Sequence, residues 1–412
     1  MERRSKYKWA RLALAASSLA IIFAFGVAVW PQSSALSITL AGQSMIRSDI
    51  RVHTPTAGAT ISPLLKGDVI FTNFEATVIE KEQSTHDGRF LSPPEALDAL
   101  QAFGFNLVAL SDNHSFDLKV PGIQNTLREA KSRNLVHAGI GNTLEEAAAP
   151  GYLHTPKGTV ALVAMASGLI AEGGSATATR PGVNELRIEA GGKPNESTSV
   201  LPVEPGNEPN PEDKQRILQS IRDARQRADL VIVYEHNHVF LNRPFEALFD
   251  EELPERLAPA DWLKKWTHEE IDAGADIIVM HGAPLVHGVE IYHNRPIFYD
   301  LGNFIFNLPP VNVRLEEPII WESVVAHVEF QGKNLQSITF QPIVMNKIGQ
   351  GQPDTQDEHT NNLYLQTRGL PKLATGDQAS YILQRLADSS RPFGTTVEVK
   401  SDSAEINLKG GN

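Results

Sequence analysis

The sequence predicts a layered α/β fold, and two observations support this prediction. Short apolar runs of strand type alternate along the chain with segments whose apolar residues recur at helical spacing. Several of the strand-like runs stop abruptly at polar residues and glycine. Because ligands bind at the carboxyl ends of strands in open α/β sheets, the same pattern predicts where a functional site would lie.

The predicted elements begin at residue 36 and follow one another along the chain. Apolar runs of strand type lie at residues 36–41, 68–71, 106–110, 159–164, 230–233, 276–280 and 296–299. Apolar residues at helical spacing predict helices at 94–103, at 123–130 and at 214–227. Thr143 and Glu146 form a capping box for a further short helix.

The later part of the chain carries weaker signals. Trp262 and Trp266 lie four residues apart on a predicted helix, a spacing typical of packing. Alternation at residues 323–330 and 337–344 predicts an antiparallel hairpin. Beyond Ile348 the chain is polar, with one helix expected near residues 381–386.

The composition excludes some classes of function. The chain has 412 residues and a formal net charge of −12 at pH 7, although its first residues are basic. Such an acidic body argues against nonspecific nucleic-acid binding. There is no cysteine, so a bound metal would need nitrogen and oxygen ligands.

The N-terminal segment predicts export. Leu12–Trp30 contains no charge, and as a helix it would span roughly 29 Å, close to the thickness of a bilayer core. Basic residues precede it, which places the N-terminus in the cytoplasm and the body outside. We favour an uncleaved signal anchor, because the run is long and Trp30 suits a membrane interface. The alternative is a signal peptide cut after Ala35, preceded by Ser33.

Residues 184–213 differ in composition from the rest of the body. They are rich in Pro, Gly, Asn and Glu and contain few apolar side chains. Such a segment cannot offset the entropy of ordering it, so we predict a surface insertion.

Polar groups gather at the ends of the predicted strands. Three clusters, at residues 73–75, 112–117 and 235–238, supply carboxylate, amide and imidazole groups, which divalent metals accept as ligands. Residues 276–306 contain a fourth group, comprising His281, His287, His293, Asp300 and Asn303. Because buried polar side chains need partners, turns alone do not explain this accumulation.

The fourth group resembles the CapA family of bacterial capsule-synthesis proteins, which are linked to poly-γ-glutamate and are similar to calcineurin-like metallophosphoesterases. The matching residues are His281, Glu290, Tyr292 and the run Tyr299-Asp300-Leu301-Gly302-Asn303-Phe304. The resemblance covers residues 37–330. It implies a metallophosphoesterase-like sandwich of two sheets flanked by helices over residues 36–345, after an N-terminal segment at 1–35 and before a polar extension at 346–412.

Other family motifs occur in the same order. Asn73 and Glu75 match an Asn-Leu-Glu motif. The run Asp112-Asn113-His114 with Asp117 matches Asn-Asn-His with a following aspartate, and His236 matches a strand-end histidine. The resemblance implies a divalent metal held by Glu75, Asn113, His236 and His281, with His114 and His236 as catalytic residues.

Two positions depart from the family pattern. Gln43 stands where the family commonly has an aspartate ligand, and Pro284 stands where a further histidine is expected. The neutral glutamine should lower metal affinity. Further candidates, some of which would compensate, are Asp49, Asn73, Asp117, His238, His287, Asp300 and Asn303. A coherent variant site and a degraded one both remain open.

Most candidates also have a purely structural interpretation. Asn73 and Asn113 would cap turns, and His114 with Asp117 would form a local hydrogen bond. His238, His287 and His293, each taken alone, are interpreted as surface or supporting groups rather than ligands. Glu75, His236 and His281 are the stronger candidates.

The resemblance implies a role in making, modifying or exporting an anionic capsule polymer such as poly-γ-glutamate. Two mechanisms are open: an assembly component that works with membrane synthase or export proteins, and a metal-dependent hydrolase of a phosphoester or of the polymer's amide bonds. The expected partners are the polymer or its precursor and the membrane, not nucleic acid.

Overall fold

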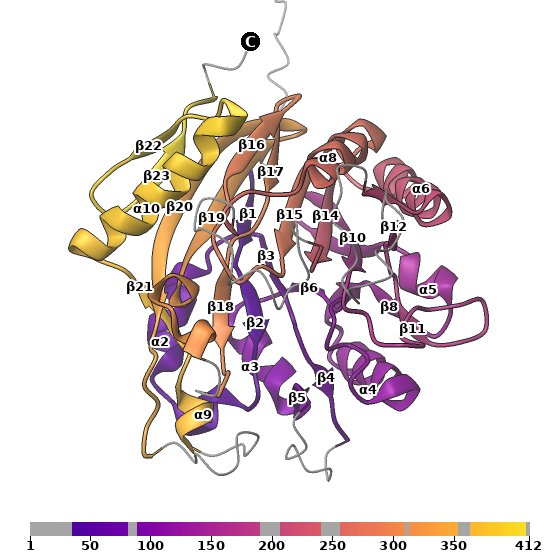
Figure 1. The fold of residues 1–412 in the computed structure, drawn as a ribbon, viewed down its shortest axis with the longest axis horizontal. Helices are drawn as coiled ribbons and strands as arrows, with labels where there is room; N and C mark the ends of the chain where they lie inside the picture. Colours follow the sequence, from indigo (N-terminus) through magenta and orange to yellow (C-terminus); the bar gives the residue numbers. More distant parts are fainter. Residues whose placement is uncertain are drawn as a thin grey trace, which may run out of the picture. The chain divides into compact units, whose positions relative to one another are not determined.

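Two β-sheets enclose a shared hydrophobic core in this protein (Figure 1). The structure is a computed structural model that describes residues 35–80, 89–189, 207–239, 256–309, 313–352 and 363–408. These residues belong to the unit formed by residues 34–412, one of the two compact units of the chain. The predicted mixed α/β class is confirmed.

The larger sheet combines a parallel half with an antiparallel half. Strands β1, β3, β6 and β7 run parallel, and β1 also pairs with the antiparallel hairpin β19–β20 that the alternation predicted. The order is β22 (Val397–Val399), β23 (Ala404–Ile406), β20 (Asn334–Met345), β19 (Glu322–Gln331), β1 (Leu36–Leu40), β3 (Val69–Asn73), β6 (Leu107–Ala109) and β7 (Val136–Ala138), with β21 (Pro371–Leu373) beside β20.

The smaller sheet has a parallel centre and antiparallel edges. Its four central strands are parallel, which places their carboxyl ends at one edge. The order is β16 (Val289–Tyr292), β17 (Arg295–Phe298), β15 (Ile277–His281), β14 (Leu230–Asn237), β10 (Gly158–Ser167) and β9 (Gly151–Thr155).

Helices cover the outer face of each sheet (Figure 1). On the smaller sheet these are α6 (Pro211–Arg227) and α8 (Asp261–Ala273), where Trp262 and Trp266 pack as predicted. On the larger sheet these include α3 (Glu95–Phe103) and α4 (Lys119–Ser132). Each fully buried leucine or phenylalanine in these layers contributes about 1.5–3 kcal/mol to stability.

Short elements connect the layers. The helices are α1 (Ile50–His53), α2 (Ala57–Ile61), α5 (Leu144–Ala148), which Thr143 caps by accepting from Glu146 N at 3.2 Å, and α9 (Leu363–Thr367). Two-stranded pairs are formed by β4 (Thr77–Val78) with β5 (Leu91–Ser92), by β8 (Ile140–Gly141) with β11 (Gly182–Val183), and by β12 (Ile188–Glu189) with β13 (Glu208–Pro209).

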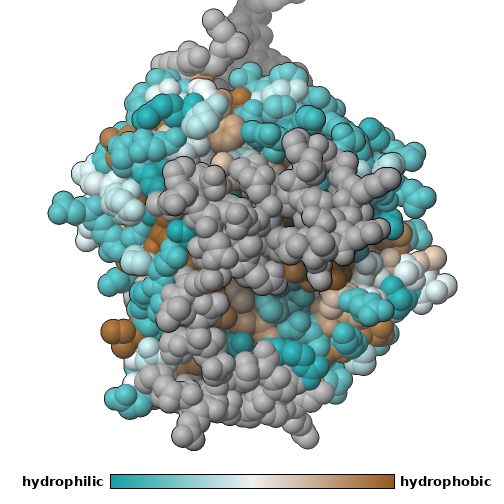
Figure 2. Space-filling model, in the orientation of Figure 1, coloured by the Kyte–Doolittle hydropathy of each residue, from teal (hydrophilic) through white to brown (hydrophobic). Residues whose placement is uncertain are grey.

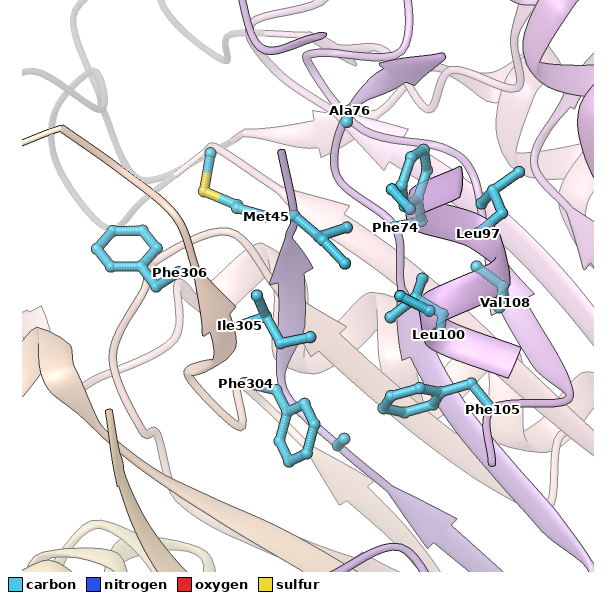
Figure 3. Packing of buried hydrophobic residues seen from close by; sticks show 14 of the residues in the cluster. Met45, Phe74, Ala76, Leu97, Leu100, Phe105, Val108, Phe304, Ile305 and Phe306 are labelled. Atoms are coloured by element: carbon cyan, nitrogen blue, oxygen red, sulfur yellow. The ribbon is translucent and has the colours of Figure 1, made fainter. Parts of the chain in front are cut away.

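A parallel pair, β2 (Gln43–Met45) with β18 (Asn303–Phe306), joins two segments that lie far apart in the sequence. Figure 3 shows Ile305 between Met45 and Phe304, with Leu100 and Phe105 across from them. The crossing is tight, because a Cβ on Gly42 would lie 2.3 Å from the Gly302 carbonyl oxygen. Glycine is therefore required where the chain enters β2.

The described surface in Figure 2 is mainly hydrophilic, with hydrophobic residues in separate patches. Large exposed apolar side chains such as Val52, Ile348 and Tyr381 are scattered over different elements. Most apolar side chains are thus buried, either between the two sheets or between a sheet and the helices that cover it.

The structure extends several sequence predictions. The run predicted at 230–233 continues as strand to Asn237, so its polar residues lie within the strand. The helix expected near 381–386 is α10 (Gly376–Ser390), and the polar tail adds β21, β22 and β23 to the larger sheet. These strands are short and partly exposed, so they lack a clear apolar pattern.

Two predicted segments fall largely outside the described residues. Of the surface insertion predicted at 184–213, residues 190–206 lie outside, while its flanks pack closely: Asn184 and Leu186 are buried, and Arg187 pairs with Asp213 at 2.6 Å. The run Leu12–Trp30 also lies outside, so its membrane role stays a prediction. Within the described residues, no helix has the length and hydropathy to cross a membrane.

Candidate metal centre

The candidate site lies at the carboxyl ends of strands from both sheets. In β14, Ile232 and Tyr234 face the core between the sheets, and the two-residue period of a strand places His236 on the same face. In β15, Val279 faces that core, and His281 follows with the same period. His236 and His281 are register partners, so the two histidines lie side by side.

The larger sheet supplies the opposite wall. Phe71 of β3 faces the shared core, and the same period places Asn73 at the carboxyl end on that face. Glu75 follows, and its backbone N–H donates to the carbonyl of Ser44 at 3.2 Å. Asn113 comes shortly after β6, the next strand of the sheet. The fold therefore brings together residues that are far apart in sequence.

Four of these side chains converge closely. His236 Nε2 lies 2.9 Å from Asn113 Oδ1 and 2.9 Å from His238 Nε2, and His238 Nε2 lies 3.2 Å from Asn113 Oδ1. Glu75 Oε1 lies 3.7 Å from His236 Nε2. Glu75, His236 and His238 offer ligand atoms that all lie within 4.8 Å of one another.

No placement of protons turns every close contact among Asn113, His236 and His238 into a hydrogen bond. The amide oxygen of Asn113 only accepts, and each neutral imidazole Nε2 either donates or accepts. If both Nε2 atoms carry a proton, two donors face each other. If either Nε2 lacks one, its lone pair faces another lone pair. Every protonation state therefore leaves at least one repulsive contact within the triangle of Asn113, His236 and His238.

A divalent cation fits this donor set. In octahedral coordination, two neighbouring ligands at about 2.1 Å from one ion are separated by about 3.0 Å, which is close to the distances between these atoms. The donors are imidazole nitrogen, amide oxygen and carboxylate, which suit borderline and hard divalent metals. Glu75, Asn113, His236 and His238 would hold the ion.

The protonation states of the histidines also suit a metal. Burial, and then the neighbouring histidines, lower the pKa of His236 well below its usual value. Burial lowers the pKa of His238 to about 3. Both rings are therefore neutral at pH 7, the form that binds metal. Burial, and then the charges of Asp112, Asp300 and Asp117, raise the pKa of Glu75 well above its usual value.

The Tyr234 hydroxyl orients the ring of His236. Its hydroxyl lies 3.1 Å from His236 Nδ1, and the tyrosine is fully buried. When Nδ1 carries the proton and donates it to the tyrosine oxygen, the Nε2 lone pair points into the triangle. A hydrogen bond on the remote nitrogen commonly fixes the tautomer of a metal-binding histidine.

A second set of polar atoms beside the cluster lacks hydrogen-bond partners. Among the described residues, neither ring nitrogen of His281 makes a hydrogen bond of normal geometry, and the same holds for the Asn73 amide, Glu75 Oε2, Gln43 Oε1 and Asn303 Oδ1. Burial lowers the pKa of His281 to about 3, against a smaller opposing effect of the Ala41 backbone. Buried orphans are uncommon in native folds, so this group indicates a ligand-binding site.

The turn after His281 requires glycine. A Cβ on Gly282 would lie 2.2 Å from the Asn237 carbonyl oxygen, and the residue has a φ of +126°. The close approach keeps the end of β15 against the end of β14. It therefore fixes His281 beside His236.

His114 and Asp117 lie at the rim of the site. His114 Nδ1 is 3.0 Å from Asp117 Oδ2, and the His114 side chain is 29 % exposed. Asp117 Oδ2 also accepts from the Phe90 backbone N–H at 2.7 Å. The predicted local hydrogen bond is present, and it leaves His114 Nε2 available for proton transfer.

Asp300 and His287 form hydrogen bonds with backbone groups rather than with the side chains of the cluster. The Asp300 carboxyl accepts from the backbone N–H groups of Ala283 at 3.0 Å and Gly302 at 2.6 Å. The His287 ring donates from Nε2 to the Arg256 carbonyl at 2.8 Å. A cavity of about 10 Å³, room for roughly one water, lies beside His281 and these two residues.

Asp49 does not join the cluster. Its carboxyl caps α1 and pairs with the Arg51 guanidinium at 2.8 Å. His293 is mostly exposed, as expected, and lies 3.3 Å from Asp272. These carboxyl and imidazole groups have local partners.

The sequence reasoning ranked one residue too low and missed another. His238 was interpreted as a surface or supporting group, yet it is buried in the cluster. Its two-residue spacing from His236 was the available signal, because both side chains then share a strand face. Tyr234 had no comparable signal, because it lies at the end of a strand-like run and matches none of the family motifs.

Comparison with known proteins gives a consistent picture. Residues 37–308 match the family described as bacterial capsule synthesis protein PGA_cap. An uncharacterized protein of Sinorhizobium fredii, y4sH, is 28% identical over 438 residues, covering 86% of this chain and 89% of that protein. The PGA biosynthesis protein CapA of Bacillus subtilis is 25% identical over 282 residues, covering 66% of this chain and 63% of that protein.

Among solved structures, the NAD nucleotidase NadN of Haemophilus influenzae aligns with a TM-score of 0.37 and 12% identity, over 76% of this chain and 50% of that chain. The family match spans more than half of the sequence and includes Glu75, Asn113, His236, His238 and His281. It supports a CapA-like function in capsule biosynthesis. This chain therefore belongs to the bacterial capsule synthesis protein family PGA_cap.

Proposed function

We propose that this chain uses a divalent-metal centre to cleave a bond of an anionic capsule polymer, of the poly-γ-glutamate class, or of its precursor. The observation that carries the proposal is the buried triangle of Asn113, His236 and His238 beside Glu75, whose contacts protons alone cannot satisfy. The metallophosphoesterase-like arrangement expected from the family fits this placement, with ligands at strand ends facing the space between two sheets.

The residues of the site have three separate roles: holding the ion, orienting a ligand, and donating a proton. A bound divalent ion supplies Lewis-acid polarisation and lowers the pKa of a water molecule. Glu75, Asn113, His236 and His238 hold the ion, and Tyr234 sets the ring of His236. At the rim, Asp117 holds His114 Nδ1, so that His114 Nε2 can give a proton to the leaving group.

The bond that is cleaved is either a phosphoester or an amide. The full chain, loaded with Mn²⁺ or Zn²⁺, should turn over a model phosphodiester or a γ-glutamyl amide polymer and lose this turnover on chelation. Exchange of His114 for Gln should lower turnover while metal is retained. Metal retention without any turnover on either substrate would contradict the hydrolase proposal.

A non-catalytic assembly role is the second candidate function. It is favoured by the two departures from the family pattern, Gln43 and Pro284, because both remove an expected ligand. Co-purification with membrane synthase proteins, together with absence of turnover, would support this role over the first.

We also propose that the body is exported and tethered by the run Leu12–Trp30. The support is the uncharged run itself and the basic residues before it. A reporter fused at the C-terminus should be active outside the cytoplasm and remain with membranes. Cytoplasmic activity would contradict this topology, whereas a released product would indicate cleavage near Ala35.

A further inference from the structure

The C-terminal extension and the part of the chain that matches the family enclose a pocket of about 580 Å³. This volume lies in the range of roughly 300–1,000 Å³ that is typical of small-molecule sites. One wall is a face of α10, and the other is the segment 257–259 together with Lys264 of α8. None of the four proposed metal ligands lines the pocket, although Ala258 and Pro259 also border the small cavity beside His281.

The end of α10 is fixed against the smaller sheet. The backbone N–H of Val289 in β16 donates to Ser390 Oγ at 3.0 Å. Just beyond the helix, the Phe393 ring stacks on the Tyr299 ring, with centroids 4.9 Å apart. The pocket is therefore held between packed elements, as pre-formed ligand sites commonly are.

Most of the described lining is apolar. Tyr381 is 55 % exposed, which is unusual for a large aromatic side chain on a packed helix. A ligand with an apolar body would remove this ring and its neighbours from water, which is favourable. The apolar lining consists of Leu257, Ala258, Pro259, Tyr381, Pro392 and Phe393.

Arg385 is the buried charged residue that lines this pocket. Its side chain is 6 % exposed, and Nη1 donates to Glu322 Oε2 at 2.7 Å. Nε and Nη2 form one edge of the guanidinium, and neither makes a hydrogen bond with the described residues. Buried N–H groups without an acceptor cost free energy. Because such an edge matches the two oxygens of a carboxylate, a bound carboxylate would satisfy both donors.

The other charged groups of the lining already have partners. Lys264 Nζ lies 2.6 Å from Asp261 Oδ1, and Asp388 Oδ1 accepts from Arg391 Nη2 at 2.8 Å. Among the lining residues, Arg385 and Lys264 are cationic and Asp388 is anionic. This balance favours an anionic ligand, and Arg385 is the group with unused donors.

We propose that this pocket binds a small carboxylic acid with an apolar body. The carboxylate would accept from Nε and Nη2 of Arg385, and the apolar body would contact Pro259, Tyr381 and Phe393. The inference does not depend on the proposed metal centre, because it uses a different cavity and different residues. It gives the C-terminal extension a role in ligand binding.

Octanoate and octanamide test the proposal, since they share an apolar body and differ in charge. Calorimetric titration of the full chain should show octanoate binding, with octanamide weaker by about 10-fold or more, because charge-assisted hydrogen bonds are stronger than neutral ones. Arg385→Lys should weaken octanoate binding by about 10-fold or more. Lysine can still pair with Glu322, but it lacks an edge with two parallel N–H groups. Octanoate should also raise the unfolding temperature of the wild type.

Arg391→Lys is the matched control. Arg391 is 75 % exposed and does not line the pocket, so its exchange should leave octanoate affinity unchanged. Thermal unfolding verifies that each variant folds. If Arg385→Lys does not fold, Tyr381→Ala, at an exposed position, should still weaken octanoate binding several-fold. The comparison of octanoate with octanamide needs no variant.

Three outcomes would overturn the inference. Absence of octanoate binding by the wild type would show that the pocket holds only water. Equal affinities for octanoate and octanamide, or an unchanged octanoate affinity in Arg385→Lys, would remove the role of Arg385. Binding of a γ-linked glutamate oligomer without binding of octanoate would assign the pocket to the polymer instead. The metal centre would stand or fall separately in every case.

Discussion

Two polar regions at the strand ends of this protein differ in how their hydrogen bonds are satisfied. After β17, the Asp300 carboxyl receives N–H groups from Ala283 and Gly302. Across the ends of β3 and β15, the Asn73 amide and both ring nitrogens of His281 make no hydrogen bond of normal geometry with the described residues. Both regions look alike in the sequence, as an apolar run followed by polar residues.

The difference separates residues that build the fold from residues that await a ligand. A carboxyl group that satisfies two backbone N–H groups stabilises a turn, and its loss would leave those groups buried and unpaired. Buried polar groups without a hydrogen-bond partner stabilise no turn, and their burial costs free energy. The hydrogen-bond partners of each buried polar group therefore distinguish the two roles, which the sequence motifs do not.

Removal of a cluster histidine should have the largest effect. His236→Ala and His238→Ala should each lower Zn²⁺ affinity by more than about 100-fold, because each removes a ligand. Metal retained after dialysis, measured by mass spectrometry, would show this. His293→Ala, at an exposed position, should retain metal like the wild type. Full retention in both cluster variants would show that the triangle is not a metal site.

Glu235 offers a test on the other face of β14. Val239 N donates to Asn237 Oδ1 at 2.9 Å, so Ser167 Oγ, at 2.8 Å, must donate to the same oxygen. The 2.7 Å contact between Ser167 Oγ and Glu235 Oε1 therefore needs a proton on Glu235. Burial raises the pKa of Glu235 to about 7, consistent with this proton.

The pH dependence follows from this raised pKa. Between pH 4.5 and 7 the folded state binds more protons than the unfolded state, so the contribution of Glu235 to stability falls as pH rises. The free energy of unfolding of the wild type should fall by roughly 3 kcal/mol relative to Glu235→Gln between these limits. Urea unfolding at a series of pH values measures this, and parallel curves for both proteins would refute it.

Asp300→Ala should affect stability more than metal binding. It leaves the N–H groups of Ala283 and Gly302 buried without an acceptor, at a cost of about 2 kcal/mol. Thermal unfolding should show the loss, and Zn²⁺ affinity of the folded variant should change little. A large loss of affinity with unchanged stability would move Asp300 to the ligand-binding group.

Tyr234→Phe should have the smallest effect. The variant keeps the buried ring but removes the oxygen that receives the His236 Nδ1 proton. Zn²⁺ affinity should fall by about 10-fold, as for other groups that orient metal-bound histidines. The Co²⁺-loaded protein should show an altered visible absorption spectrum. An unchanged affinity and spectrum would mean that packing alone orients His236.

Much of the fold follows from the sequence, because strands and helices differ in apolar period. Alternation predicted the β19–β20 hairpin, and the spacing of Trp262 and Trp266 predicted their packing. The short strands β21, β22 and β23 were not predictable, since they add partly exposed residues at a sheet edge. The length of β14 was also underestimated, because its last residues are polar yet buried.

The site was predictable only in outline. Motif matching identified Glu75, Asn113 and His236. These residues were expected to converge, because parallel strands bring their carboxyl ends to one edge. It could not separate His238, which joins the cluster, from His287, which bonds to a backbone carbonyl. That difference depends on three-dimensional neighbours.

The most direct test locates the ion itself. A crystal of the full chain grown with Zn²⁺ would be measured at wavelengths on both sides of the zinc absorption edge. The account predicts an anomalous difference peak about 2.0–2.2 Å from Asn113 Oδ1, His236 Nε2 and His238 Nε2, with Glu75 completing the ligands. A peak at Asp300 and His287 instead, or none at the triangle, would contradict it.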